Sequence, residues 1–346
     1  MSERRIYLDE CVGEARGVVT LDGAPERLLI RREGDDPRLL LGARLAAVTA
    51  SVEPQLSTAF LDVGGGAQVI LPFKPGARPA RGQVLEVEVR AEPRRGKLAI
   101  VRLVGEAEGP PRLLSPPPDL SSVLAGFARA AALVVGREAR EIADLAEAEA
   151  LETIHALPGG GRLSIEPTRA LTAVDVDLGE RKGADAKRVT RAANLAAIGL
   201  CARLLRLKGV GGLVVMDLAG RGHEPATLLA AARAAFAPDN PGVALGSVGR
   251  FGTLEISLPR RTRPLSEVLL DEAGVLTDRS LAQRLVRRLA AEAEADPGAR
   301  LAAVCVPSVA AVAEPMVGRL AGRFGARLVL REDSERPRES FDVARS

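Results

Sequence analysis

The first hundred residues alternate between apolar and polar side chains with the two-residue period of β-strands. Three strands are predicted first, with a turn at Asp22-Gly23, and they cover residues 4–8, 17–21 and 28–32. Five more follow at 46–52, 58–63, 68–72, 83–89 and 97–104. Five short strands at such close spacing predict a small closed barrel, with an OB-fold as the leading candidate.

Beyond the proline-rich segment at 110–118, the period changes to a mixture of helices and strands. Helices are predicted at 119–135, 138–151, 185–207 and 225–236. Strands are predicted at 162–165, 171–178, 212–217, 242–247 and 253–258. From the first of these strands, the order β-β-α-β-α-β-β indicates a mixed sheet with helices packed on it. After Pro264, helices at 280–294 and 308–324 and strands at 301–306 and 327–331 predict a small separate α/β unit.

Carboxylates stand out in two of the apolar strands. Asp175 and Asp177 close the run Leu-Thr-Ala-Val-Asp-Val-Asp at 171–177, and Asp217 closes Gly-Leu-Val-Val-Met-Asp at 212–217. Strand alternation places Asp175 and Asp177 on one face, with backbones roughly 6.6 Å apart. Two charges at that distance repel by about 2 kcal/mol at an effective dielectric near 20. A divalent cation of the Mg²⁺ or Mn²⁺ type would relieve this repulsion. Carboxylates that are solvated or paired with arginine are the alternative interpretation.

The composition is that of a globular protein with room for two or three domains. Hydrophobic residues make up 47% of the chain, aromatic residues only 2%, and there is no Trp, which argues against an aromatic-rich base-stacking surface. The net charge of +3 is a weak argument for nucleic acid, because most basic side chains are balanced by acidic ones. The charged first ten residues and the lack of a long apolar stretch lead us to expect a cytoplasmic protein without membrane contact.

Cysteine and histidine give little sign of chemistry. Cys11, Cys201 and Cys305 are far apart in sequence, so neither a disulfide nor a zinc ribbon is expected. His155 and His223 are the two histidines, and we interpret both as structural or loop-exposed. No serine or cysteine nucleophile motif accompanies either of them, which disfavours triad chemistry.

Residues 160–265 resemble the catalytic part of the ribonuclease E/G family. The resemblance rests on blocks that occur in the family's order, at 161–177, 181–183, 194–195, 205–217 and 249–257. On either side it is weaker: residues 59–64 and 70–72 resemble the family's inserted OB-type RNA-binding barrel, and 275–344 resemble its small C-terminal domain.

This resemblance implies an α+β multidomain fold. A shortened RNase H-like subdomain is expected from residues 1–40 and 106–157, with an OB-fold RNA-binding barrel at 41–105 inserted into it. A DNase I-like catalytic subdomain would cover 158–265, and a small C-terminal α/β domain would cover 266–346.

The resemblance further implies an Mg²⁺-dependent endoribonuclease of RNA processing or decay, which hydrolyses single-stranded RNA and leaves a 5′-phosphate. Asp175 and Asp217 match the family's two metal-binding aspartates. Asp177 stands where the family usually has Asn, and we interpret it as a third catalytic carboxylate that orients water or holds an outer-shell ligand.

Basic and aromatic residues near these positions are candidates for RNA binding. Arg181, Lys182 and Arg250 are predicted to contact phosphates. Phe251 and the barrel residue Phe60 are predicted to stack on bases, and Lys97 to contact the RNA backbone. Solvated loop charges and ordinary core packing are the structural alternatives.

Two departures from the family pattern bear on function. The family's zinc-binding Cys-x-x-Cys is missing, since residues 264–275 contain no cysteine, so we expect no zinc and no zinc-linked dimer, but a monomer or a zinc-independent oligomer. The region before the catalytic hairpin is shortened and lacks a match to the Arg-Thr pair that senses a 5′-monophosphate. These departures keep two alternatives open: a catalytically inactive RNA-binding regulator of the same fold, and an interaction protein whose C-terminal unit docks a partner.

Overall fold

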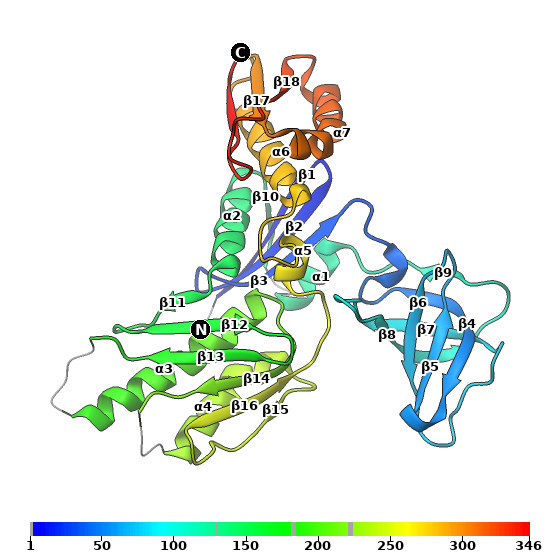
Figure 1. The fold of residues 1–346 in the computed structure, drawn as a ribbon, viewed down its shortest axis with the longest axis vertical. Coiled ribbons are helices and arrows are strands. Elements are labelled where there is room, and N and C mark those ends of the chain that lie inside the picture. The colour runs from blue at the N-terminus through cyan, green and yellow to red at the C-terminus, as the bar shows by residue number, and fades with distance from the viewer. Residues whose placement is uncertain (1–2, 129–130, 181–184, 221–223) are drawn as a thin grey trace.

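The computed structural model describes residues 3–128, 131–180, 185–220 and 224–346, and within them the strands form four sheets (Figure 1). The candidates Arg181 and Lys182, and also His223, lie outside the described residues. A search of the described helices finds none with the length and apolar character needed to cross a membrane.

The N-terminal sheet has the strand order β10-β1-β2-β3. Its strands are β1 (Arg4–Cys11), β2 (Glu14–Leu21), β3 (Ala24–Arg32) and β10 (Leu133–Val135). Asp22 and Gly23 form the predicted turn, with φ of 50° and 81°. Helix α1 (Leu120–Phe127) packs with Ile6 and Leu8 on one face, and α2 (Arg137–Leu151) packs with Tyr7 and Val18 on the other.

The helix predicted at 119–135 is wrong beyond Phe127. Residues 133–135 instead form β10, which pairs in parallel with Ile6–Leu8 of β1. Leu-Val-Val is a short apolar run that suits a strand as well as a helix, so periodicity alone did not separate the two.

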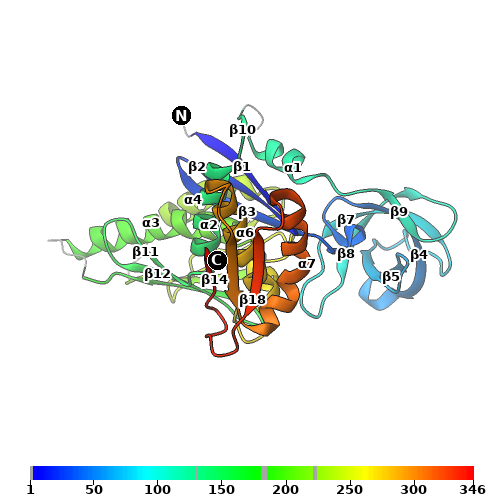
Figure 2. The ribbon, with the colours of Figure 1, turned by 90° about the horizontal axis from the view of Figure 1, so that it is seen from above.

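The predicted barrel is present. It is built from β4 (Arg44–Glu53), β5 (Thr58–Asp62), β6 (Gln68–Pro72), β7 (Val84–Ala91) and β8 (Ala99–Glu106), with β9 (Arg112–Ser115) added at β4. The ladder runs β4-β5-β6-β8-β7 and returns to β4, so the five strands close, as in an OB-like fold. The barrel has its own core around Leu45, Leu61 and Val87, and it stands to one side of the other sheets in both views (Figures 1 and 2). Short 3₁₀ helices cover Pro37–Leu39 and Pro54–Leu56.

The sheet that carries the aspartates has the order β11-β12-β13-β14-β16-β15. Its strands are β11 (Ile154–Ala156), β12 (Arg162–Pro167), β13 (Thr172–Asp177), β14 (Gly212–Asp217), β15 (Ala244–Leu245) and β16 (Thr253–Leu258). Helices α3 (Ala186–Leu207) and α4 (Pro225–Phe236) cover one face, and a 3₁₀ turn follows at Ala237–Asp239. The mixed sheet was predicted; β11 was missed, and the strand predicted at 242–247 is reduced to the two residues of β15.

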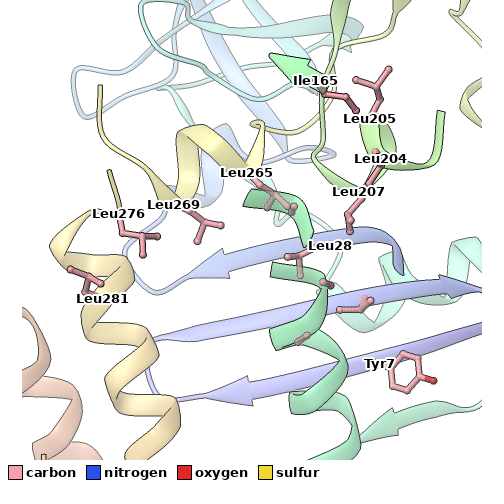
Figure 3. Close-up of a cluster of buried hydrophobic side chains, with 14 of the residues drawn as sticks. Tyr7, Leu28, Ile165, Leu204, Leu205, Leu207, Leu265, Leu269, Leu276 and Leu281 are labelled. Atoms are coloured by element: carbon pink, nitrogen blue, oxygen red, sulfur yellow. The ribbon is translucent and has the colours of Figure 1, made fainter. Parts of the chain in front are cut away.

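The C-terminal unit contains a three-stranded sheet of order β18-β17-β19. Its elements are α5 (Leu265–Leu269), α6 (Asp278–Ala295), β17 (Leu301–Cys305), α7 (Pro307–Phe324), β18 (Leu328–Glu332) and β19 (Asp342–Arg345). The unit is less separate than its sequence suggested. Leu269 and Leu281 belong to the same buried cluster as Leu28 of β3 and Leu204 of α3, and Figure 3 shows side chains of this cluster spread from α6 across α5 and β3 to α3.

A buried ion network joins the N-terminal sheet to α2 and α6. Arg16 is fully buried, and its guanidinium lies 2.6 Å from Asp9 and 3.1 Å from Glu147. Arg287 of α6 lies 3.0 Å from Glu147 and also contacts Glu14. Each of these three carboxylates has a guanidinium partner, so the network bridges segments more than a hundred residues apart.

Candidate active site

Asp175 and Asp217 lie opposite each other on the neighbouring parallel strands β13 and β14. Adjacent strands are about 4.8 Å apart, and residues in register point to the same face of a sheet. Both side chains are exposed. The structure therefore brings together the two carboxylates that the sequence placed 42 positions apart, on a surface open to solvent.

The direction of these carboxylates follows from the residues that alternate with them. Val174 and Val176 of β13, and Val214 and Met216 of β14, are buried beneath α3 and α4. Burial of these side chains forces the intervening aspartates onto the opposite face. The register continues outward on both sides, so one row across four strands consists of Ser164, Asp175, Asp217 and Thr253.

The backbone beyond Asp217 is held from two sides. The amide of Leu218 donates to the carbonyl of Gly252 over 3.0 Å. The side chain of Asn194, on α3 and 1% exposed, donates to the carbonyl of Ala219 at 3.1 Å and accepts from its amide at 3.0 Å. Asn194 thus fixes the turn that positions Asp217.

The sequence interpretation gave Asn194 no role, although the residue lies within a matched block. A signal was present: Asn194 takes the i position of an i, i+4, i+7 stripe that continues with Ile198 and Cys201, both buried. A polar side chain on the apolar stripe of a helix needs a hydrogen-bond partner inside the protein.

Asp177 lies on the same exposed face, one step beyond the row of four. Its Oδ1 accepts a 2.8 Å hydrogen bond from the amide of Gly179, which fixes the chain as it leaves β13. Among the described residues, no group of three or more His, Cys, Asp or Glu side chains is arranged to hold a metal. The candidate ligands are therefore the pair Asp175 and Asp217, and Asp177 remains a predicted contributor to catalysis.

The electrostatics of the pair favour a cation. Partial burial raises the pKa of Asp175, and the neighbouring charges of Asp217 and Asp177 raise it further. Within the described part of the chain neither Asp175 nor Asp217 forms an ion pair, so the arginine-paired alternative is not seen there. The two carboxylates supply only oxygen ligands, and a bound cation would relieve the repulsion between their charges. Both properties fit a hard divalent ion such as Mg²⁺ or Mn²⁺.

Arg250 and Phe251 lie beside the pair. They form the turn between Gly249 and Gly252, which leads into β16 where Thr253 is in register with Asp217. Phe251 is 77% exposed, and the guanidinium of Arg250 lies 4.5 Å from the centre of its ring. An exposed aromatic ring can stack on a base, and a neighbouring guanidinium can bind a phosphate.

Phe60 and Lys97 are not brought to the aspartates, because both belong to the barrel. Phe60 points outward from β5, half-buried, in register with Ser51 and Ile70. Lys97 is exposed in the β7–β8 connection. This connection contacts the segment after β16, where the amide of Glu92 donates to the carbonyl of Arg261 over 2.7 Å.

Comparisons with known proteins match the part of the chain that carries these strands. The family model described as "Ribonuclease E/G family" matches residues 139–261, which include β12–β16 and both aspartates. Over these residues the chain is similar to the ribonuclease E/G family. The strands that carry Asp175 and Asp217 thus lie inside the matched region.

Individual relatives match the same part of the chain. Ribonuclease E of Haemophilus influenzae is 35% identical over 114 residues, covering 32% of this chain and 12% of that protein. Ribonuclease E of Escherichia coli is 35% identical over 115 residues, covering 32% of this chain and 11% of the relative. A chloroplastic ribonuclease E/G-like protein of Arabidopsis thaliana is 31% identical over 121 residues, or 34% of this chain and 12% of that protein. The match therefore spans about an eighth of the length of these relatives.

Proposed function

We propose that this protein is a divalent-cation-dependent endoribonuclease that cuts single-stranded RNA and leaves 5′-phosphate ends. The observation that carries the proposal is the register of Asp175 with Asp217, two exposed carboxylates on adjacent parallel strands within the region that matches the ribonuclease E/G family. The proposal includes Mg²⁺ as the ion, the cytoplasm as the location, and the RNase H-like and DNase I-like identities of the subdomains that flank the barrel.

Asp175 and Asp217 would hold the ion through carboxylate oxygens. When bound, Mg²⁺ supplies Lewis-acid polarisation of the scissile phosphate and a more acidic water. Asp175 must be ionised to act as a ligand, and its raised pKa means that the ion competes with a proton for this carboxylate. Asn194, through Ala219, keeps the Asp217 strand end in place without touching substrate.

Phe251 and Arg250, in the turn beside the two aspartates, would bind and orient the RNA strand. Phe251 offers an exposed ring to a base next to the scissile bond, and Arg250 offers a guanidinium to a phosphate. Each stacked base contributes about 1–3 kcal/mol. Phe60 and Lys97 would bind a more distant part of the same strand on the barrel, because both are presented away from the aspartates.

The test is cleavage of a 5′-labelled single-stranded RNA in Mg²⁺. The parent protein is expected to cut internally, whereas Asp175→Asn and Asp217→Asn are expected to lose at least about 100-fold in rate, a loss of about 2.7 kcal/mol in transition-state stabilisation. Glu255→Gln is the matched control, because Glu255 is exposed on the same face but pairs with Val215 rather than with an aspartate.

The outcomes separate the alternatives. Unchanged cleavage by both aspartate variants contradicts the proposed site. RNA binding by the parent protein without any product in Mg²⁺ or Mn²⁺ identifies the inactive RNA-binding regulator instead. Absence of RNA binding at low salt favours the interaction protein.

A further inference from the structure

The barrel carries two kinds of arginine. On its outer wall the cations face carboxylates: Arg90 and Arg102 lie 3.2 Å and 2.6 Å from Glu88. The β6–β7 loop differs, since Arg78 and Arg81 are exposed and neither has an ion-pair partner among the described residues. No acidic residue occurs between Asp62 and Glu86 in the sequence, so the loop is a local excess of positive charge.

A cleft of about 650 Å³ lies between this loop and β4. Arg78, Pro79 and Arg81 line one side, and Ser51 lies on the other. Ser51 is in register with Phe60 of the neighbouring strand β5, so the outward-facing aromatic side chain lies one strand away from this side of the cleft. The loop therefore presents two guanidiniums without an ion-pair partner among the described residues, near a half-buried aromatic side chain on the next strand.

The loop is anchored where it carries the arginines. The amide of Gly82 donates to the carbonyl of Thr49 over 2.8 Å, and the amide of Ala80 donates to the side chain of Gln83 over 2.9 Å. Pro79 is buried between the two arginines. An anchored loop loses less conformational entropy on binding than a free one, so its cations are pre-organised for a ligand.

We propose that the β6–β7 loop is a phosphate-binding arm of the barrel, in which Arg78 and Arg81 each contact one backbone phosphate of a single-stranded RNA whose base stacks on Phe60. This inference rests on the proposed function for the identity of the polymer. A single strand is favoured over a duplex because stacking on Phe60 requires an accessible base face, and in a duplex the neighbouring stacked base pairs cover the faces.

The experiment measures binding of a fluorescent 15-nucleotide RNA to the full chain by anisotropy in EDTA, so that the result does not depend on cleavage. The variant R78A/R81A is compared with R90A/R102A, which removes the same charge from the same barrel at arginines paired with Glu88. R78A/R81A is expected to raise the Kd about tenfold, and to reduce the slope of log K against log salt by about 1.4, the value for two phosphates of a single strand. R90A/R102A is expected to change the Kd less than about twofold, because Glu88 partly neutralises the charge of these two arginines.

Equal Kd and slope for R78A/R81A and the parent protein overturn the proposal, as does an equal loss in both double variants. An equal loss for a duplex of the same length also overturns it, since the loop would then bind any polyanion. The two proposals can fail separately. If R78A/R81A binds RNA as well as the parent protein and the parent protein cuts RNA in Mg²⁺, the proposed nuclease function stands and only the phosphate-binding role of the loop is contradicted.

Discussion

The acidic residues of this protein occupy two contrasting settings. In the network around Arg16, Asp9 and Glu147 are buried, and each has a guanidinium partner. Burial alone would raise the pKa of Glu147, but its arginine neighbours outweigh burial and lower it. On the open face of the second sheet, Asp175 has carboxylates for neighbours and its pKa is raised. The carboxylates paired with arginine hold parts of the fold together. The carboxylates around Asp175 repel one another and are available to a cationic ligand.

The largest expected effect comes from breaking the paired set. Arg16→Met leaves Asp9 and Glu147 with one guanidinium fewer in a buried position, and removing one partner of a buried ion pair costs about 3–5 kcal/mol. Denaturant unfolding should show this loss. Arg137→Met is the control, because Arg137 pairs with Glu141 at the exposed surface, and it should cost less than about 1 kcal/mol. Equal losses in the two variants would contradict the structural role of the network.

A second effect is expected where the fold positions the site. Asn194→Ala leaves the buried amide and carbonyl of Ala219 without partners, which costs about 1–3 kcal/mol in stability. It should also lower kcat about tenfold and raise the Mg²⁺ concentration at half-maximal cleavage, because the Asp217 strand end is released. Gln283→Ala, at an equally buried but remote position in α6, should lower stability and leave the Mg²⁺ dependence unchanged.

The third substitution, Asp175→Asn, is expected to increase stability, whereas the first two lower it. A carboxylate whose pKa is raised in the folded state stabilises the protein below its unfolded pKa, and this stability is lost as pH rises through the folded pKa. Asp175→Asn removes the repulsion, so the metal-free variant should be more stable than the parent at neutral pH, by no more than about 1 kcal/mol for an exposed site. The advantage should shrink as pH falls toward the raised pKa. Thermal unfolding in EDTA from pH 4 to pH 8 measures this, and a parent protein of higher Tm at pH 8 would contradict it.

The smallest effect is expected at Asp177. Asn can accept the hydrogen bond from the amide of Gly179 as Asp does, so Asp177→Asn keeps the turn and removes one charge. The cleavage rate should change less than about tenfold, and the pH at which cleavage is half-maximal should fall, because one of the charges that raise the pKa of Asp175 is gone. A loss as large as that of Asp217→Asn would make Asp177 a ligand in its own right.

The exposed carboxylates around Asp175 could be predicted from the sequence, whereas the buried ion network around Arg16 could not. Strand alternation is enough to place Asp175 and Asp177 on one face, and the resemblance to a family pairs Asp175 with Asp217. The contact of Arg16 with Glu147 joins residues 131 positions apart, and nothing in the local pattern around either residue signals it. The role of Asn194 and the strand at 133–135 were missed for a related reason, since both depend on which distant backbone lies alongside.

The central claim is that Asp175 and Asp217 together hold a divalent ion. The most direct measurement is the thermal unfolding of the parent protein, Asp175→Asn, Asp217→Asn and Glu255→Gln as Mg²⁺ is added. The account predicts that Tm rises with Mg²⁺ for the parent and for Glu255→Gln, with a gain of about 2.7 kcal/mol at a hundredfold excess over the Kd. It predicts no rise for either aspartate variant. An equal Mg²⁺-dependent rise in all four proteins, or none in the parent, would contradict the claim.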